Sequence, residues 1–148
     1  MIALDTNILV YAVASDDPES RHVQALELVD QLGMADGAVV PIQVIGEFLN
    51  VCRRKRPVSF DHAVRRAAQF LNAFDCPQTR PNDLIDAFAV SAQHNVQYFD
   101  ALIVIVACRT GATTLLSEDM KDGREIEGLR ILNPFNPANR ADINELLA

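Results

Sequence analysis

Four acidic residues stand at the borders of apolar runs in this chain: Asp5, Glu47, Asp100 and Asp119. Asp5 ends the run Ile2–Leu4, and Asp119 follows the run Thr113–Leu116 by three residues. Carboxylates that a fold brings together repel each other by roughly 4 kcal/mol per pair at about 4 Å in a dielectric of about 20. A cluster of this kind therefore needs a cation, and Mg²⁺ or Mn²⁺ suits an all-oxygen site.

Length and composition describe an ordinary globular protein. A chain of 148 residues is long enough to bury about two-thirds of its unfolded surface, and we expect a single domain over residues 1–148. Hydrophobic residues make up 49% and charged residues 22% of the chain, which is a common balance. The net charge of −7 disfavours loose binding of nucleic acid by the whole surface but leaves room for a local basic rim.

The cysteines and the hydropathy pattern exclude several classes of protein. Cys52, Cys76 and Cys108 lack the close spacing of a disulfide framework or a zinc site, so we expect reduced thiols and a cytoplasmic location. No apolar run approaches the roughly 20 residues of a membrane helix, and no signal peptide is visible at the N-terminus. We therefore expect no membrane association.

The coarse pattern alternates strands and helices. Short strands are predicted at Ile2–Leu4, Ala38–Val40, Thr114–Leu116 and Leu129–Leu132. Helices are predicted at 8–14, from Asp16–Glu19 to about Met34, at 42–54, from Ser59 or Asp61 to about Phe74, from Asn82 or Asp83 to about Asn95, and in the tail. This alternation predicts an α/β fold with a parallel sheet covered on both faces. The loops at the carboxyl ends of its strands would bring Asp5 and Asp119 together.

Residues Leu102–Val106 fit two structures equally well. Five consecutive aliphatic residues favour a buried strand by propensity. A wholly buried helix fits as well, with Asp100 as its N-cap and Gly111 as its stop. Spacing alone leaves this alternative open.

Four segments in succession resemble the motifs of the PIN-domain family, and most closely the VapC-type toxins of bacterial toxin–antitoxin pairs. The segments are LDTNILVYA, the acid in IGEFLNV, YFDALIVIVA, and TTLLSEDMKDG followed by GLRILNPF. The resemblance spans Ile2 to Phe135. It implies a three-layer α/β/α sandwich around a small parallel sheet and a helix after Asp100. It also implies a metal-dependent endoribonuclease, an antitoxin partner and a homodimer.

The acids of the family pattern correspond to Asp5, Glu47, Asp100 and Asp119. On this resemblance we expect Asp5 and Asp100 to be the most direct ligands of Mg²⁺ or Mn²⁺, with Asp119 completing the site directly or through water. Glu47 would bind a second ion or orient the attacking water. A divalent ion suits this chemistry because it makes water a nucleophile near neutral pH. Ligating carboxylates need hydrogen-bonded support, for which Asn7 and Ser117 are candidates, either there or as substrate contacts.

The densest positive patch is the run Arg53–Arg56. Its ordinary explanation is a helix C-terminus, whose dipole favours cations; its functional explanation is a rim that holds RNA phosphates. Arg54 lies seven residues after Glu47, two turns along the same helical stripe, and is the best candidate for a phosphate contact. The role of Asp122 is left open. The three histidines have no metal spacing, so we assign them no catalytic role.

Two other functions compete with the ribonuclease toxin. One is a PIN-like domain that binds or processes RNA with little or no cleavage, against which the complete acid set weighs. The other is a phosphatase on a similar sheet. That chemistry usually needs a second aspartate two residues after the first, and Asn7 stands at that position.

Overall fold

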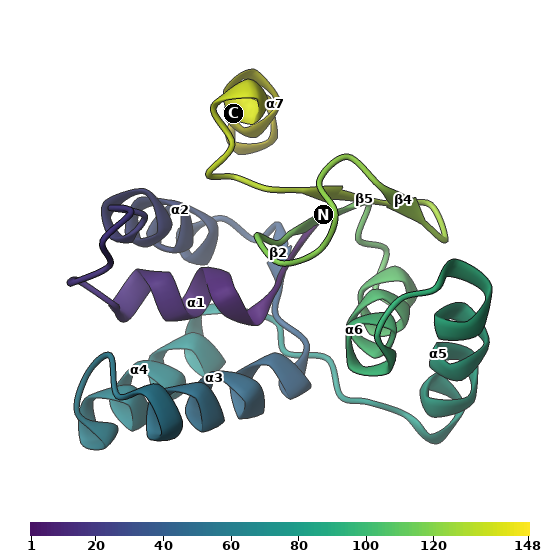
Figure 1. The fold of residues 1–148 in the computed structure, drawn as a ribbon, viewed down its shortest axis with the longest axis horizontal. Coiled ribbons are helices and arrows are strands. Elements are labelled where there is room, and N and C mark those ends of the chain that lie inside the picture. Colours follow the sequence, from purple (N-terminus) through teal and green to yellow (C-terminus); the bar gives the residue numbers. More distant parts are fainter.

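The computed structural model describes all residues from Met1 to Ala148, and its centre is a five-stranded sheet (Figure 1). The strand order is β2-β1-β3-β5-β4. The strands are β1 Ile2–Leu4, β2 Ala38–Val39, β3 Thr114–Leu116, β4 Glu125–Ile126 and β5 Leu129–Leu132. All pairs are parallel except β4 with β5. The predicted α/β/α class with a small parallel sheet is confirmed.

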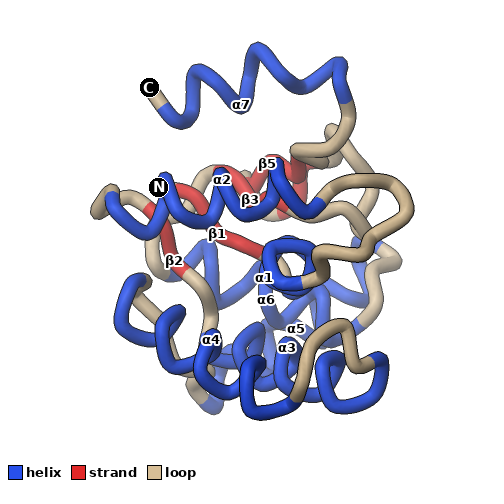
Figure 2. The backbone as a smooth tube through the Cα atoms, turned by 90° about the vertical axis from the view of Figure 1, so that its left-hand side faces the viewer, coloured by secondary structure: helices blue, strands red, loops and turns tan.

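Seven α-helices surround the sheet: α1 Thr6–Val13, α2 His22–Met34, α3 Ile42–Lys55, α4 Phe60–Ala73, α5 Pro81–His94, α6 Tyr98–Arg109 and α7 Arg140–Leu147. A 3₁₀ turn at Pro137–Asn139 precedes the last of them. In Figure 2, α7 lies on one side of the strands and α3 to α6 lie on the other. One continuous core of 39 buried residues joins these layers. None of the helices combines the length and the apolar composition that crossing a membrane would require.

Helix α6 resolves the ambiguous apolar segment in favour of a helix. It is buried almost all round, with six buried residues between Ala101 and Ala107, and such a helix lies inside a core rather than on its surface. The expectation that Asp100 is the N-cap was wrong. The side chain of Gln97 caps the helix by accepting from the Asp100 backbone N–H, which places Asp100 in the first turn.

Two predicted helix starts were also wrong. Helix α2 begins at His22 rather than within Asp16–Glu19, because the Asp17 carboxylate binds the backbone N–H and guanidinium of Arg21 and Ser20 adopts a left-handed φ of 57°. Helix α5 begins at Pro81, one residue before the expected caps. There the buried Asp83 accepts from the Arg80 backbone N–H and pairs with Arg109 at 2.8 Å.

Strand β4 was missed because it is only two residues long. The residues Glu127 and Gly128, which connect it to β5, both have positive φ, 53° and 79°, as a tight hairpin turn requires. A further helix start differs from the prediction: α1 begins at Thr6 rather than at Ile8, because the Asp5 side chain caps it by accepting from the Thr6 N–H. The Ser59 side chain caps α4, as predicted, by accepting from the His62 N–H. The three cysteines form no disulfide.

Candidate active site

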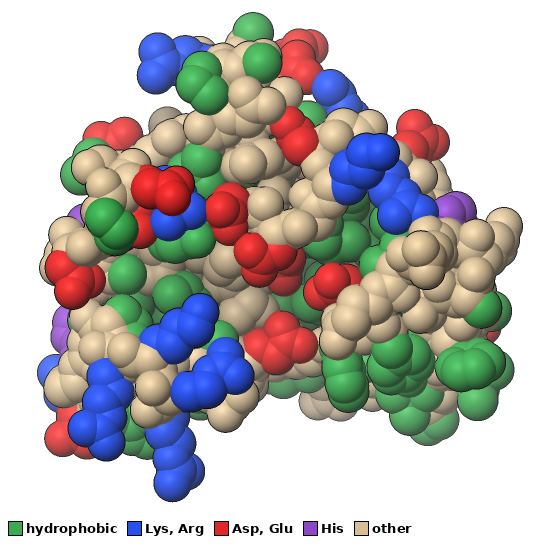
Figure 3. All heavy atoms as spheres, in the orientation of Figure 1, with side chains coloured by type: hydrophobic (Ala, Val, Ile, Leu, Met, Phe, Trp, Pro, Cys, Tyr) green, Lys and Arg blue, Asp and Glu red, His purple; other side chains and the backbone are tan.

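The four predicted acids converge on one cavity. Asp5 follows β1 directly, Asp119 lies in the loop after β3, Glu47 is in the middle of α3, and Asp100 is in the first turn of α6. All four line a cavity of about 970 Å³. In Figure 3, acidic side chains gather in the middle of the face shown. The parallel sheet explains the convergence, because the carboxyl ends of β1 and β3 are adjacent in it.

Asp5 is the most firmly held of the four. Its side chain accepts hydrogen bonds from the Thr6 backbone N–H at 2.7 Å, the Ser117 hydroxyl at 2.7 Å and the Asn7 amide at 3.3 Å. The residue is only 4% exposed. Burial raises the pKa of its carboxyl, the bonds from Ser117 and Thr6 oppose that rise, and the charges of Asp119 and Glu47 add to it.

Asn7 links the two loops that carry Asp5 and Asp119. Its Oδ1 accepts from the backbone N–H of Glu118 at 3.0 Å, and this bond turns the Nδ2 donor toward the carboxylates. Nδ2 then donates to Asp119 at 3.1 Å as well as to Asp5. Asn7 and Ser117 therefore both donate hydrogen bonds to the predicted acids.

Glu47 has two hydrogen-bond donors that sequence analysis missed. The Thr6 hydroxyl donates to it at 2.7 Å, and the Gln43 amide donates to it at 2.6 Å. Gln43 precedes Glu47 by one helical turn, a spacing that places both side chains on the same face and could have predicted this contact. Thr6 carried no comparable signal, because its partner is 41 positions away in the chain.

Asp100 differs from the other three acids, because no hydrogen bond reaches its carboxylate. Only its backbone N–H is engaged, in the bond to Gln97. Burial raises the pKa of Asp100 to about 6, and the charges of Asp5, Glu47 and Asp119 contribute to the shift. The four carboxylates thus interact electrostatically across the cavity.

The donor set fits a hard divalent cation, but the side chains do not form a closed shell. All four acids offer carboxylate oxygens, and none of the ion pairs in the molecule neutralises any of them. No three His, Cys, Asp or Glu side chains are placed so that they could hold a metal ion together. The four acids line one cavity and their charges interact. A cation held there would therefore draw the side chains inward or bind some of them through water.

The basic run lies at the rim of the same cavity. Arg54, Lys55 and Arg56 line it together with the acids, whereas Arg53 lines a separate cavity beside Val58 and Phe60. Figure 3 shows basic side chains gathered on the same face as the acidic ones. Arg54 forms no ion pair, so its charge is available to an anionic ligand.

Asp122 lies outside this cavity and anchors the chain after β5. It accepts from the Asn133 backbone N–H at 2.9 Å and from the side-chain amides of Asn136 and Asn139 at 2.8 Å. Burial by itself would raise the pKa of Asp122, but these hydrogen bonds outweigh burial and lower it. Its place in the structure is therefore that of a loop anchor rather than a fifth acid of the cavity.

The strand order and the acids at the carboxyl ends of β1 and β3 place the chain among α/β proteins with a site at the edge of a parallel sheet. Comparison with known proteins identifies the family. The family model for the PIN domain matches residues 2–122. The chain therefore belongs to the PIN domain family. The comparison with curated proteins gives no match.

Several solved structures share the fold. VapC20 of Mycobacterium tuberculosis, described as a sarcin–ricin loop cleaving toxin, is 20% identical with a TM-score of 0.68, over 80% of this chain and 90% of that one. A toxin–antitoxin complex from Klebsiella pneumoniae gives 20% identity and a TM-score of 0.63, over 91% and 98%. PAE2754 from Pyrobaculum aerophilum is 16% identical with a TM-score of 0.62, and the match covers 99% of this chain and 91% of that one. At these identities the likeness shows the fold.

Proposed function

We propose that this protein is an endoribonuclease that depends on Mg²⁺ or Mn²⁺, hydrolyses RNA phosphodiester bonds and acts as the toxin of a toxin–antitoxin pair. One observation carries the proposal: four carboxylates from four separate segments line one cavity, and none of them forms an ion pair. A fold gains no stability from such an arrangement, so the arrangement is best explained by a ligand.

Each residue has a proposed role. Asp5 and Asp100 are the main metal ligands, Asp119 completes the site, and Glu47 binds a second ion or orients the attacking water. Asn7 supports Asp5 and Asp119, and Ser117 supports Asp5, through the hydrogen bonds described above. The bound cation would neutralise the carboxylates and activate water for attack on phosphorus. Arg54, at the rim, would hold a phosphate of the RNA.

The competing function is a PIN domain that binds or processes RNA without cutting it. The open arrangement of the acids favours this alternative, because no closed metal shell is present. The gathering of four acids in one cavity weighs against it, since a binding module needs no clustered acids facing a polyanion.

Incubation with labelled RNA separates the two. The wild-type protein and Asp100→Asn are mixed with single-stranded RNA and ribosomal RNA, with Mn²⁺ or Mg²⁺ and with EDTA. Asp61→Asn, at the exposed first turn of α4, is the matched control. Cleavage by the wild type and by Asp61→Asn, abolished by EDTA and by Asp100→Asn, supports the nuclease. RNA binding without cleavage, or cleavage that survives EDTA, contradicts it.

Arg54 is tested in the same assay against its neighbour Arg53, which lines the other cavity. Loss of one phosphate contact lowers the salt slope of single-stranded binding by about 0.7. We expect this decrease for Arg54→Ala and not for Arg53→Ala. Equal effects of the two changes would show that the Arg53–Arg56 run attracts RNA by its overall charge and that Arg54 makes no specific phosphate contact.

We propose two protein partners. An antitoxin is proposed because one structure with this fold is a toxin–antitoxin complex. A second copy of the chain is proposed because α5 exposes an apolar face, with Ile85 71% and Phe88 69% exposed and Leu84 beside them. Light scattering on wild type and Phe88→Glu tests the homodimer: a dimer that the charge disrupts supports it, and a monomeric wild type contradicts it.

The proposal treats the chain as one domain in the cytoplasm. Residues beyond the family match are integrated with those inside it, because β5 pairs with β3 and Asp122 binds Asn133 and Asn139. The cytoplasmic location is proposed from the free cysteines and the absence of a disulfide framework.

A further inference from the structure

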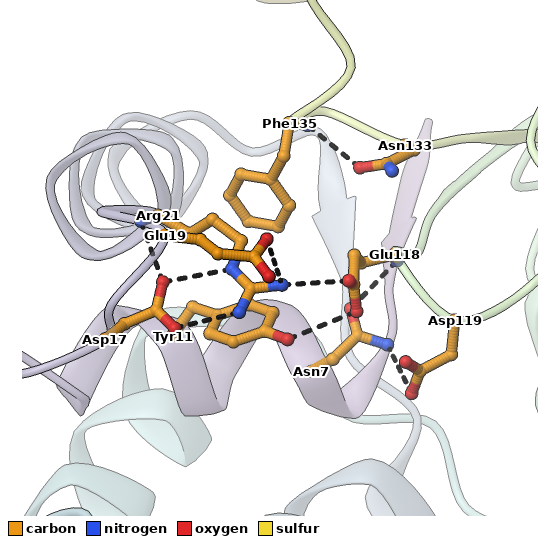
Figure 4. A network of polar contacts seen from close by, with 9 residues as sticks. All are labelled: Asn7, Tyr11, Asp17, Glu19, Arg21, Glu118, Asp119, Asn133 and Phe135. Atoms are coloured by element: carbon orange, nitrogen blue, oxygen red, sulfur yellow. Dashed lines mark hydrogen bonds and ion pairs between the residues drawn. The ribbon is translucent and has the colours of Figure 1, made fainter.

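A second polar cluster lies beside the acidic cavity, and its centre is Arg21 (Figure 4). We call Tyr11, Asp17, Arg21 and Glu118 the Arg21 cluster. These residues come from α1, from the turn before α2 and from the loop after β3. Their side chains are shielded, with exposures of 16% for Arg21, 6% for Asp17 and 24% for Glu118.

The guanidinium of Arg21 is held by acids of its own neighbourhood. It donates to Asp17 from Nε at 3.0 Å and from Nη2 at 2.8 Å, and Nη1 donates to Glu118 at 2.9 Å. It lies 4.0 Å from the centroid of the Tyr11 ring, and Glu19 is a further acid at 3.4 Å. Arg21 lines the same cavity as Arg54. Because its guanidinium already pairs with acids of the protein, Arg21 is a poorer candidate than Arg54 for binding an RNA phosphate.

Glu118 is the residue through which this cluster meets the candidate site. Its carboxylate accepts from Arg21 and, at 3.2 Å, from the Tyr11 hydroxyl. Burial and then the adjacent Asp119 raise the pKa of Glu118, while Tyr11 and Arg21 oppose the rise. Tyr11 is held in turn by Phe135, whose ring packs edge-on against it at 5.4 Å. These contacts keep the Glu118 side chain beside Arg21 and Tyr11, and Glu118 does not line the acidic cavity.

The backbone of Glu118 then acts on the acids. Its N–H donates to Asn7 Oδ1 at 3.0 Å. That bond fixes which end of the amide faces the cavity, so that Nδ2 donates to both Asp5 and Asp119. A chain of contacts thus runs from Arg21 through Glu118 and Asn7 to two proposed metal ligands, and Figure 4 shows it reaching Asp119.

We propose that Arg21 is a positioning residue of the acidic site: it holds the Glu118 carboxylate out of the cavity and thereby fixes the orientation of Asn7 between Asp5 and Asp119. The effect on cleavage rests on the proposed nuclease function, whereas the effect on Asn7 does not. Removing Arg21 leaves Glu118 as an uncompensated, partly buried charge. Glu118 would then turn toward Asp119 and compete for the same cation.

The test is a double-mutant cycle with Arg21→Met, Glu118→Gln and the double variant. Met keeps much of the length of Arg without its charge, and Gln removes the charge of Glu118 while keeping its shape. Arg130→Met is the matched control, because Arg130 also pairs with an aspartate, Asp142 at 2.7 Å, but does not line the cavity. Tyr11→Phe removes the second bond to Glu118 and leaves the ring packing in place.

Two measurements are made on each variant. The first is the NMR signal of the Asn7 side-chain amide in metal-free protein, and the second is kcat and KM for RNA with Mn²⁺. We expect Arg21→Met to shift the Asn7 signal and to lower kcat about tenfold with KM nearly unchanged. Tyr11→Phe should shift the signal in the same direction by less, and Arg130→Met should change neither quantity.

The double variant decides whether Arg21 acts through Glu118. If it does, Glu118→Gln in the Arg21→Met background returns the Asn7 signal and part of kcat toward wild type. A double variant that is as impaired as Arg21→Met would overturn the proposal, since it would show that Arg21 only anchors its loop. An Asn7 signal unmoved by Arg21→Met and Tyr11→Phe would also overturn it. RNA left intact by the wild type would refute the nuclease function, and the metal-free signal would still decide the role of Arg21.

Discussion

The two sides of the acidic cavity are built differently. On the sheet side, Asp5 accepts three hydrogen bonds and Asn7 ties it to Asp119. On the helix side, Glu47 accepts two hydrogen bonds, but the carboxylate of Asp100 accepts none. The pKa of Asp100 is raised to about 6 by burial and then by the other three acids. The protein itself therefore organises the sheet side. The charge of Asp100 is left for a ligand to compensate.

The largest expected effect is the loss of cleavage when either side loses its main acid. Asp5→Asn and Asp100→Asn should each lower the single-turnover rate at least about a thousandfold, because a bound cation contributes several kcal/mol of transition-state stabilisation. The measurement is cleavage of labelled RNA with Mn²⁺ at saturating protein. Either variant cutting at the wild-type rate would remove that residue from the ligand set.

The same two variants should differ in stability without metal. Asp100→Asn relieves repulsion and breaks no hydrogen bond of the carboxylate, so the free energy of unfolding should rise by about 1–2 kcal/mol, allowing for solvent screening of the shift. Asp5→Asn should gain less, because an amide cannot accept from all three donors of Asp5. Urea unfolding in EDTA measures both. A larger gain for Asp5→Asn would reverse the contrast between the two sides.

The pH dependence of stability should show the same contrast. The folded-state pKa of Asp100 is raised from 3.8 to about 6, so the folded state holds a proton in this window that the unfolded state has lost. Stability of the metal-free protein should therefore fall as pH rises from about 4 to about 6 and then level off. Asp100→Asn should flatten this decline, and a decline of unchanged slope in the variant would assign it to other groups.

The pH dependence that Asp17 gives to stability should have the opposite sign. Hydrogen bonds from Arg21 lower the pKa of Asp17 to about 2. Its contribution is present above the unfolded pKa and is lost as pH falls from about 4 to about 2. The two acids therefore affect separate pH windows, which one titration of unfolding in EDTA can resolve.

The smallest expected effect is on the support of the sheet side. Ser117→Ala removes the hydroxyl that donates to Asp5 and accepts from the Met120 N–H, and should lower the free energy of unfolding by about 1 kcal/mol. Thr keeps the hydroxyl, so Ser117→Thr should retain more of the wild-type Mn²⁺ affinity than Ser117→Ala. Thermal unfolding and Mn²⁺ titration of the pair provide the check, and equal Mn²⁺ affinities for wild type and Ser117→Ala would show that this bond does not support the site.

The meeting of Asp5 and Asp119 could be predicted because the ends of neighbouring parallel strands lie at one edge of the sheet. That Glu47 and Asp100 join them followed only from the resemblance to the PIN-domain motifs. The sequence also placed Asn7, Ser117 and Arg54 at or beside the cavity. The contacts that distinguish the two sides could not be predicted. Glu118 meets Arg21 across 97 positions and Tyr11 across 107, and no periodicity reports contacts of that separation.

The errors have a shared cause. Asp17 was expected at a helix start, but its pairing with Arg21 makes a turn there instead. Asp100 was expected as a cap, but Gln97 provides the cap. In both places an acid with a plausible capping role does something else: Asp17 pairs with Arg21 four residues later, and the Asp100 carboxylate lines the cavity without a hydrogen-bond donor. Local capping rules cannot distinguish these arrangements from a cap.

The central claim is that the four acids form one cation site in which the Asp100 carboxylate, unlike Asp5 and Glu47, has no hydrogen-bond donor until the cation binds. Calorimetric titration of Mn²⁺ into wild type and Asp100→Asn, between pH 5 and pH 7, tests it most directly. We predict saturable Mn²⁺ binding by the wild type, with affinity that rises with pH through about 6 as Asp100 loses its proton, and at least tenfold weaker binding in the variant. Absence of Mn²⁺ binding by the wild type, or equal affinity in Asp100→Asn, would contradict the account.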